Sequence, residues 1–260
     1  MKRRNLLILA GAAPLGLHAQ VADITDAINK AGRQRMLSQR MGKAWLALVH
    51  QTEGRSAQAV LDRSMSLFDR QLAELKGFAP NPAIRDTYTE LESAWSDYKG
   101  ALVGAVPNRA AAHAVLKADS RVLALAHQGT LQYEAVMARP VGRLVNVAGR
   151  QRMLSQRMAK FYYAATLPVD PTTAIAEIGK ARAEFQSAMT LLRDAPEANA
   201  RIRDELTLAD SQWLFFDQAL QRLQSGAAAS ARPMSDVFVT SENLLSVMDR
   251  VTDLYANLKS

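Results

Sequence analysis

The residues best suited to chemistry in this sequence are two arginines, Arg35 and Arg152, that occupy the same position in a duplicated stretch. The eleven residues AGRQRMLSQRM occur at 31–41 and again, unchanged, at 148–158. At 100° per residue, each of these arginines lies midway along a helical stripe of small and apolar residues. A planar guanidinium group suits a planar oxyanion such as nitrate, nitrite or a carboxylate. The duplicated stretch therefore predicts an anion site.

A glycine lies three positions before each of the two arginines, on the same stripe. Gly32 and Gly149 each cost a helix about 0.5–1 kcal/mol relative to alanine, so a glycine here indicates that another helix or a ligand approaches the backbone closely. The first stripe consists of Ile24, Ile28, Ala31, Gly32, Arg35, Ser38, Gln39, Gly42, Leu46 and Val49. The second repeats it with Val141, Val145, Ala148, Gly149, Arg152, Ser155, Gln156 and Ala159.

If the two motif helices face each other across a pseudo-twofold axis, Arg35 comes close to Arg152. At about 6 Å and an effective dielectric near 20, two like charges repel by roughly 3 kcal/mol, and desolvating each guanidinium costs more. No acid lies on either stripe, so a bound anion would remove both penalties. The alternative is that the stripes are only packing surfaces, with the arginines reaching water or acids on other helices.

The remaining basic residues of the first stretch point to a third side of the helix. Arg33, Arg40 and Lys43 are expected to face water there, as a solvated basic face. A partner protein could also use such a face.

The duplication extends through the whole chain, at offsets that drift from 117 to 122 residues. Corresponding pairs include Asn29 with Asn146, Trp95 with Trp213, and Tyr133 with Tyr255. Helical periodicity, broken by proline and glycine, predicts four helices in each copy. Their expected ranges are 23–53, 56–76, 82–104 and 109–138 in the first copy, and 141–166, 172–193, 196–224 and 233–258 in the second.

Four helices with short connections favour an antiparallel bundle. We therefore predict an all-α fold of two tandem antiparallel four-helix bundles, related by a pseudo-twofold axis. The first module is expected at 21–138 and the second at 139–260, with the boundary near Arg139 and Pro140.

The first twenty residues have the features of a signal peptide. A basic head of Lys2, Arg3 and Arg4 precedes an apolar stretch of about twelve residues, and cleavage is expected near Ala19. That stretch is short for a membrane span, which needs roughly twenty residues. We expect export to the periplasm, by the general or the twin-arginine route, and no transmembrane segment in the mature chain. Part of the formal charge of +7 lies in this head, so the charge is weak evidence for a nucleic-acid partner.

Enzyme and metal chemistry find little support in the residues. The sequence has no cysteine, no Glu-x-x-His pair and no His-Glu-x-x-His helix. His50, His113 and His127 are isolated in the sequence and are interpreted as surface or satisfied residues. We therefore expect no catalytic residues, no metal ion and no cofactor.

The stretch from Asn29 to Met41, and its copy from Asn146 to Met158, resemble a known sensor motif. It is similar to the first helix of the periplasmic domain of NarX-type nitrate/nitrite sensor kinases and PilJ-type pilus chemotaxis transducers. The resemblance implies a four-helix bundle that dimerises through this helix and holds one anion at the symmetry axis. It assigns the ligand contacts to the glycine and the arginine three residues later, which are Gly32, Arg35, Gly149 and Arg152 here.

This chain departs from the family because it carries both halves of the site and no kinase or methyl-accepting domain. One function follows from the anion site: a periplasmic sensor or binding protein for a small oxyanion, nitrate or nitrite preferred. It would present the anion to a membrane receptor or transporter. The alternative is a ligand-free helical interaction module that contacts a receptor or a type IV pilus or chemotaxis component. Whether the two modules pair within one chain or between chains stays open.

Overall fold

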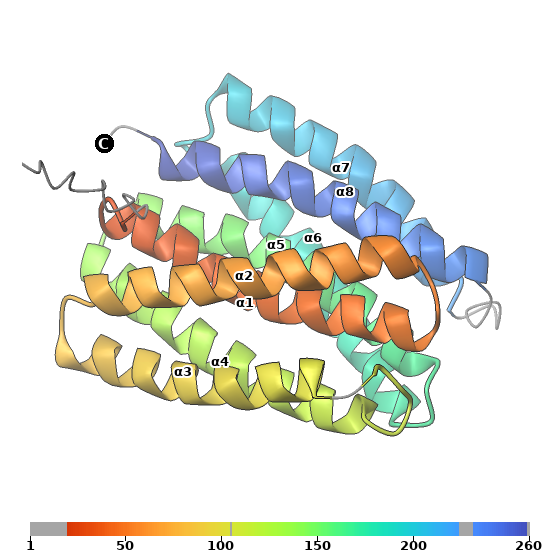
Figure 1. Ribbon diagram of the computed structural model, residues 1–260. Helices are drawn as coiled ribbons and strands as arrows, with labels where there is room; N and C mark the ends of the chain where they lie inside the picture. The colour runs from red at the N-terminus through yellow and green to blue at the C-terminus, as the bar shows by residue number, and fades with distance from the viewer. Residues whose placement is uncertain (1–19, 105, 224–230, 259–260) are drawn as a thin grey trace, which may run out of the picture.

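The fold is all-α, as predicted, with eight long helices in the part of the chain that is described. The structure is a computed structural model that describes residues 20–104, 106–223 and 231–258 (Figure 1). The predicted signal peptide lies outside these residues, apart from Gln20. The helices are α1 Ile24–Val49, α2 Gly54–Phe78, α3 Pro82–Val103, α4 Ala112–Met137, α5 Pro140–Ala165, α6 Pro171–Asp194, α7 Ala200–Gln221 and α8 Ala231–Ala256.

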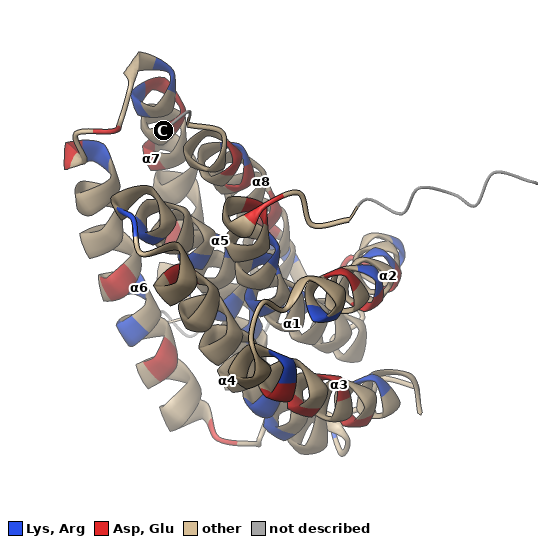
Figure 2. Ribbon diagram, turned by 90° about the vertical axis from the view of Figure 1, so that its left-hand side faces the viewer, with Lys and Arg blue, Asp and Glu red and all other residues tan. Residues whose placement is uncertain are grey.

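Two motif helices, α1 and α5, form the centre of the molecule. They pack along each other in its most extensive helix contact. In each half the motif helix also packs on the second and fourth helices, α2 and α4 or α6 and α8. Figure 2 shows the same arrangement from the side, with α1 and α5 at the centre, α2 and α3 on one side and α6 and α7 on the other.

The two halves repeat the same packing details. Phe68 packs on Trp95 with ring centroids 4.4 Å apart, and Phe185 packs on Trp213 at 4.5 Å. The corresponding tyrosines of α4 and α8 donate hydrogen bonds to the backbone oxygens of Leu75 and Leu192. The repeat read from the sequence is therefore a structural repeat. The division of the chain into modules at 138 and 139 stays a prediction.

Side-chain caps define several helix starts. Asp23, Asn81 and Asp170 accept hydrogen bonds from backbone N–H groups of the first turn. Asn108 accepts from the N–H of Ala111, which lies one residue before α4 begins. For α7 the predicted start at 196 was wrong, because Asn199 supplies the capping oxygen and the helix begins after it.

The expectation that Lys43 faces water was wrong. Its side chain is fully buried, and Arg33 and Arg40 keep only 19% and 20% of their side-chain surface exposed. The cause is α8 of the second half, which lies against this side of α1 and pairs its acids Asp249 and Glu242 with these cations.

Within the described residues, no helix has both the length and the apolar character that a membrane span requires.

Candidate functional site

The structure brings together the four residues that the sequence selected. A Cβ added to Gly32 would lie 3.2 Å from Nη2 of Arg35, 3.6 Å from Nη2 of Arg152 and 3.9 Å from Cα of Gly149. A Cβ added to Gly149 would lie 3.1 Å from Nη2 of Arg152 and 3.8 Å from that of Arg35. Both arginine tips therefore lie over both glycines, where α1 crosses α5.

Each arginine reaches across to the opposite motif helix. Nη2 of Arg35 donates to Oδ1 of Asn146 at 2.7 Å and to its backbone oxygen at 3.3 Å. Nη2 of Arg152 donates to Oδ1 of Asn29 at 2.8 Å and to its backbone oxygen at 3.1 Å. The two asparagines were recognised as a repeated pair, but their role as arginine partners needed the crossing geometry of α1 and α5.

Both guanidinium groups are fully buried and keep unused donors. The side chains of Arg35 and Arg152 have no exposed surface, and neither Nε has a hydrogen-bond partner among the described residues. Burial, together with nearby Arg150 and Arg152, lowers the pKa of Arg35 to about 9. Burial and nearby Arg33 lower the pKa of Arg152 to about 10. Both groups stay charged at neutral pH, and each leaves a buried N–H unsatisfied, which is unfavourable.

The remaining tip of each arginine meets a different partner in the two halves. Nη1 of Arg35 donates to Nδ1 of His127 on α4 at 3.2 Å, whereas Nη1 of Arg152 donates to a carboxylate oxygen of Asp249 on α8 at 2.5 Å. His127 and Asp249 are corresponding residues at the offset of 122 that relates Tyr133 to Tyr255.

These contacts bear on two expectations. No acid lies on the arginine stripes, but Asp249 reaches Arg152 from another helix, as the packing alternative anticipated. His127, isolated in the sequence and interpreted as a surface or satisfied residue, is satisfied by a hydrogen bond from Arg35. Burial, and then the charge of Arg35, lower the pKa of His127 to about 4, so its ring is neutral at neutral pH.

A second polar layer lies further along the same interface. Gln39 donates to Oδ1 of Asp119 on α4 at 2.7 Å, and Gln156 donates to the backbone oxygen of Ser241 on α8 at 2.9 Å. Lys160 of α5 forms an ion pair with Asp119, in which the two side chains are 1% and 0% exposed.

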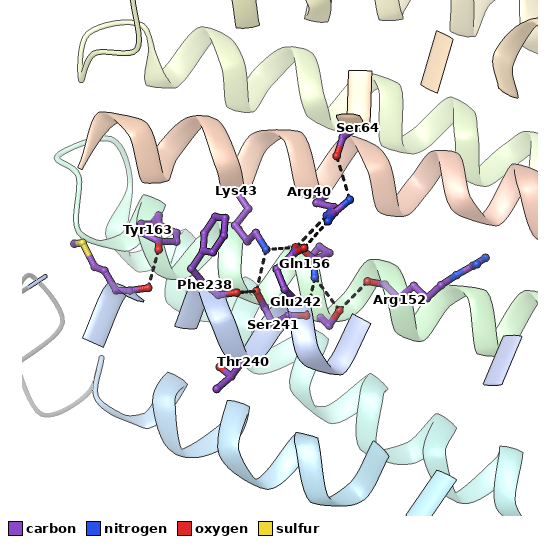
Figure 3. Close-up of polar contacts among 12 residues, drawn as sticks. Arg40, Lys43, Ser64, Arg152, Gln156, Tyr163, Phe238, Thr240, Ser241 and Glu242 are labelled. Carbon is purple, nitrogen blue, oxygen red and sulfur yellow. Dashed lines mark hydrogen bonds and ion pairs between the residues drawn. The ribbon is translucent and has the colours of Figure 1, made fainter. Parts of the chain in front are cut away.

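The corresponding lysine of α1 uses a different acid. Nζ of Lys43 donates to Oγ of Ser241 at 3.0 Å and to a carboxylate oxygen of Glu242 at 2.6 Å. Figure 3 shows Lys43 and Arg40 converging on Glu242, with Gln156 and Ser241 beside them. Burial alone would raise the pKa of Glu242, but the charges of Lys43 and Arg40 lower it to about 2. The buried lysine of each motif helix, Lys43 or Lys160, thus forms an ion pair with an acid of the other half, and these pairs join the two halves.

The described residues contain no cluster of three or more His, Asp or Glu side chains placed to hold a metal ion. The polar groups of this interface are instead arginines, lysines, amides and hydroxyls paired with single acids. Such groups bind anions or one another.

The comparisons with known proteins identify the family. The family model described as PilJ, "Type IV pili methyl-accepting chemotaxis transducer N-term", matches residues 19–127 and 137–238. No curated protein and no solved structure matches the chain. Each matched segment holds one copy of the motif and one of the two corresponding Phe–Trp contacts. Together the segments cover most of the sequence. The chain therefore belongs to the PilJ family of chemotaxis-transducer sensory domains, of which it carries two tandem copies.

Proposed function

We propose that this chain is a periplasmic sensory protein that binds one small oxyanion, nitrate or nitrite preferred, between α1 and α5. The ligand contacts would come from Gly32, Arg35, Gly149 and Arg152. The observation that carries the proposal is the pair of fully buried guanidinium groups over two facing glycines, each with an Nε that has no partner in the described part of the chain.

The charge balance at this point favours an anion. Two buried cations lie beside one directly bonded carboxylate, that of Asp249. Glu134 acts on Arg35 only at a distance, since its carboxylate accepts from the amide of Asn146. A buried charge without a paired counterion is costly. A monoanion would offset that charge and accept from the unused N–H groups.

The glycines explain how the site leaves room for the guanidinium tips. Any larger residue at Gly32 or Gly149 would place its Cβ within 3.2 Å of an arginine nitrogen. The guanidinium tips would then have to shift by a few tenths of an ångström away from the backbone. This accounts for a glycine that otherwise weakens each helix.

The family membership supports a sensory role and the periplasm as the place of action. With the predicted signal peptide, the chain would present its anion state to a membrane receptor, a transporter or a pilus component. We propose a binding role and no catalytic activity, since the two titratable groups that contact the arginines, His127 and Asp249, are held in hydrogen bonds to them.

A second candidate function is a ligand-free helical interaction module for a pilus or chemotaxis component. The observation that favours it is the existing hydrogen bonding of the arginine tips. Asn29, Asn146, His127 and Asp249 already accept from them, so the interface closes without a ligand.

Calorimetric titration of the mature chain with sodium nitrate and sodium nitrite, in a buffer free of other strong anions, separates the two. We expect saturable heat with about one anion per chain. The double substitution Arg35→Ala with Arg152→Ala should abolish the heat, because both guanidinium groups that would donate to the anion are then lost. Circular dichroism melting checks that the variant is folded. Arg193→Ala, which removes a surface arginine paired with Asp210, serves as the control and should bind normally.

A conservative variant covers the case in which the double alanine chain does not fold. Arg35→Lys keeps the charge but loses the planar two-point donor, and we expect at least about a tenfold loss of affinity. Absence of heat with both anions in the unmodified chain, or binding that survives the loss of both arginines, would contradict the anion site and leave the interaction module.

A further inference from the structure

The arginine pair is symmetric in its helices but asymmetric in its charge. The glycines, the arginines and the asparagines correspond in the two halves. The residues that accept from Nη1 of the two arginines differ in charge: His127 accepts from Arg35, and Asp249 accepts from Arg152. This single difference gives Arg152 an anionic partner in direct contact and gives Arg35 a neutral one.

Asp249 is an anion already present at the site. Its carboxylate contacts Nη1 of Arg152 at 2.5 Å and Nη2 of Arg33 at 3.0 Å. Although burial alone would raise it, these two arginines hold the pKa of Asp249 below its usual range. The carboxylate is therefore ionised at neutral pH, and it neutralises part of the charge that would otherwise attract a free anion.

The carboxylate of Asp249 can also move away from Arg152. About 40% of its side-chain surface is exposed, so the carboxylate can turn into water without becoming an unpaired buried charge. It lines a groove of about 450 Å³ between α1, α2 and α8, which also includes Arg33 and Arg40. An aspartate at the edge of an open groove is placed to exchange with a dissolved anion.

The opposite side lacks such a competitor. His127 lines a groove of about 360 Å³ between α4, α5 and α6, together with Arg150 and Arg157 and the glutamates paired with them, Glu184 and Glu177. Its neutral ring accepts from Arg35 and adds no negative charge. Among the residues that the structure describes, no carboxylate contacts the buried Arg35 on this side.

We propose that Asp249 is an internal competitor for the ligand of this site: it occupies Arg152, leaves Arg35 as the principal anchor, and thereby weakens anion binding. The inference rests on the proposed oxyanion site and adds the residue that sets its affinity. The ligand class it implies is a single small monoanion, because one uncompensated guanidinium charge remains.

Two substitutions shift the competition in opposite directions. Asp249→Asn keeps the shape and an acceptor oxygen but removes the charge, so both guanidinium groups become available. We expect nitrate to bind about tenfold tighter or more. His127→Asp places a second carboxylate opposite Arg35, and we expect nitrate binding to fall by about tenfold or more, since each arginine then has an internal anion.

The test is calorimetric titration of the full mature chain with sodium nitrate and sodium nitrite at constant ionic strength. Two controls match the changes in charge. Glu205→Gln removes a carboxylate from an ion pair with Arg250 on α8, and His113→Asp adds one at an exposed position of α4. Both should bind as the unmodified chain does.

The outcomes distinguish this inference from the proposed function. If the unmodified chain binds nitrate and Asp249→Asn binds no tighter, the competition is overturned and the anion site stands. If only Asp249→Asn binds, the competition is supported and the native chain is not a nitrate sensor. If neither binds, both proposals fall. Should Asp249→Asn not fold, His127→Asp decides alone: undiminished binding overturns the competition.

Discussion

Replacing Asp119 with asparagine is expected to lower the free energy of unfolding by about 3–5 kcal/mol, the range for removing one partner of a buried ion pair. Asp119 and Lys160 are 0% and 1% exposed in their side chains. Asparagine keeps the shape and can still accept from Gln39, but its charge is gone and the ammonium of Lys160 is left without a counterion. The loss should appear in urea unfolding at pH 7, followed by circular dichroism.

The pH dependence of that variant provides a second signature. Burial already lowers the pKa of Lys160, against the attraction of Asp119. Without Asp119 the folded chain holds this proton less tightly than the unfolded chain does, so stability should rise as the pH increases toward 10. The deficit of Asp119→Asn relative to the unmodified chain should therefore shrink in alkali.

Two further variants show whether the cost comes from the uncompensated charge. Asp210→Asn breaks an exposed pair with Arg193 and should cost about 1 kcal/mol or less. The double substitution Asp119→Leu with Lys160→Met replaces the pair by apolar groups and should recover most of the loss. A deficit below about 1 kcal/mol for Asp119→Asn would show that the pair does not hold the halves together.

The second half shows how the protein itself manages a serine at this position. Ser241 corresponds to Asp119. Its hydroxyl accepts a hydrogen bond from the buried Lys43 but carries no negative charge. The neighbouring Glu242 provides the counterion for Lys43 instead. One buried lysine in each motif helix thus keeps an acid from the other half, although the acid has moved by one residue.

The helices and the four central residues could be predicted because they follow from local rules. A period of 3.6 residues places Gly32 and Arg35 on one stripe, and the exact repeat at Gly149 and Arg152 indicates a shared site. Proline and glycine breaks gave the helix ranges to within a few residues. These features need no knowledge of how distant helices pack.

The partners of the central residues could not be predicted, because they come from helices far along the chain. Asp249 follows Arg152 by 97 residues and His127 follows Arg35 by 92. Which helix covers the third side of α1 depends on the pseudo-twofold packing of the halves. A helical wheel therefore placed Lys43 in water, where α8 in fact buries it. The correspondence of His127 with Asp249 was the available signal for the asymmetry.

His127 should make the folded chain sensitive to mild acid. Its pKa is lowered from 6.5 to about 4 in the folded protein, by burial and by Arg35. Between these values the unfolded chain binds more protons, so acid favours unfolding: the stability is complete above pH 6.5 and is lost as the pH falls toward 4. Because the ring is only half-buried, solvent screening reduces the effect, and we expect a loss of about 1–2 kcal/mol over this window.

His127→Gln isolates this contribution, because its amide oxygen can still accept from Arg35 but does not titrate. We expect urea unfolding of the unmodified chain to lose stability from pH 6.5 downward and the variant to lose much less. His50 has a pKa lowered by burial and contributes with the same sign in both chains, so the difference between them belongs to His127. Measurements should stay above pH 4.5, because Glu242, with a pKa of about 2, destabilises the fold only as the pH falls from 4.5 toward 2. Parallel pH profiles for the two chains would mean that His127 is solvated in the folded protein, and that Arg35 lacks the neutral partner on which its role as the principal anion anchor depends.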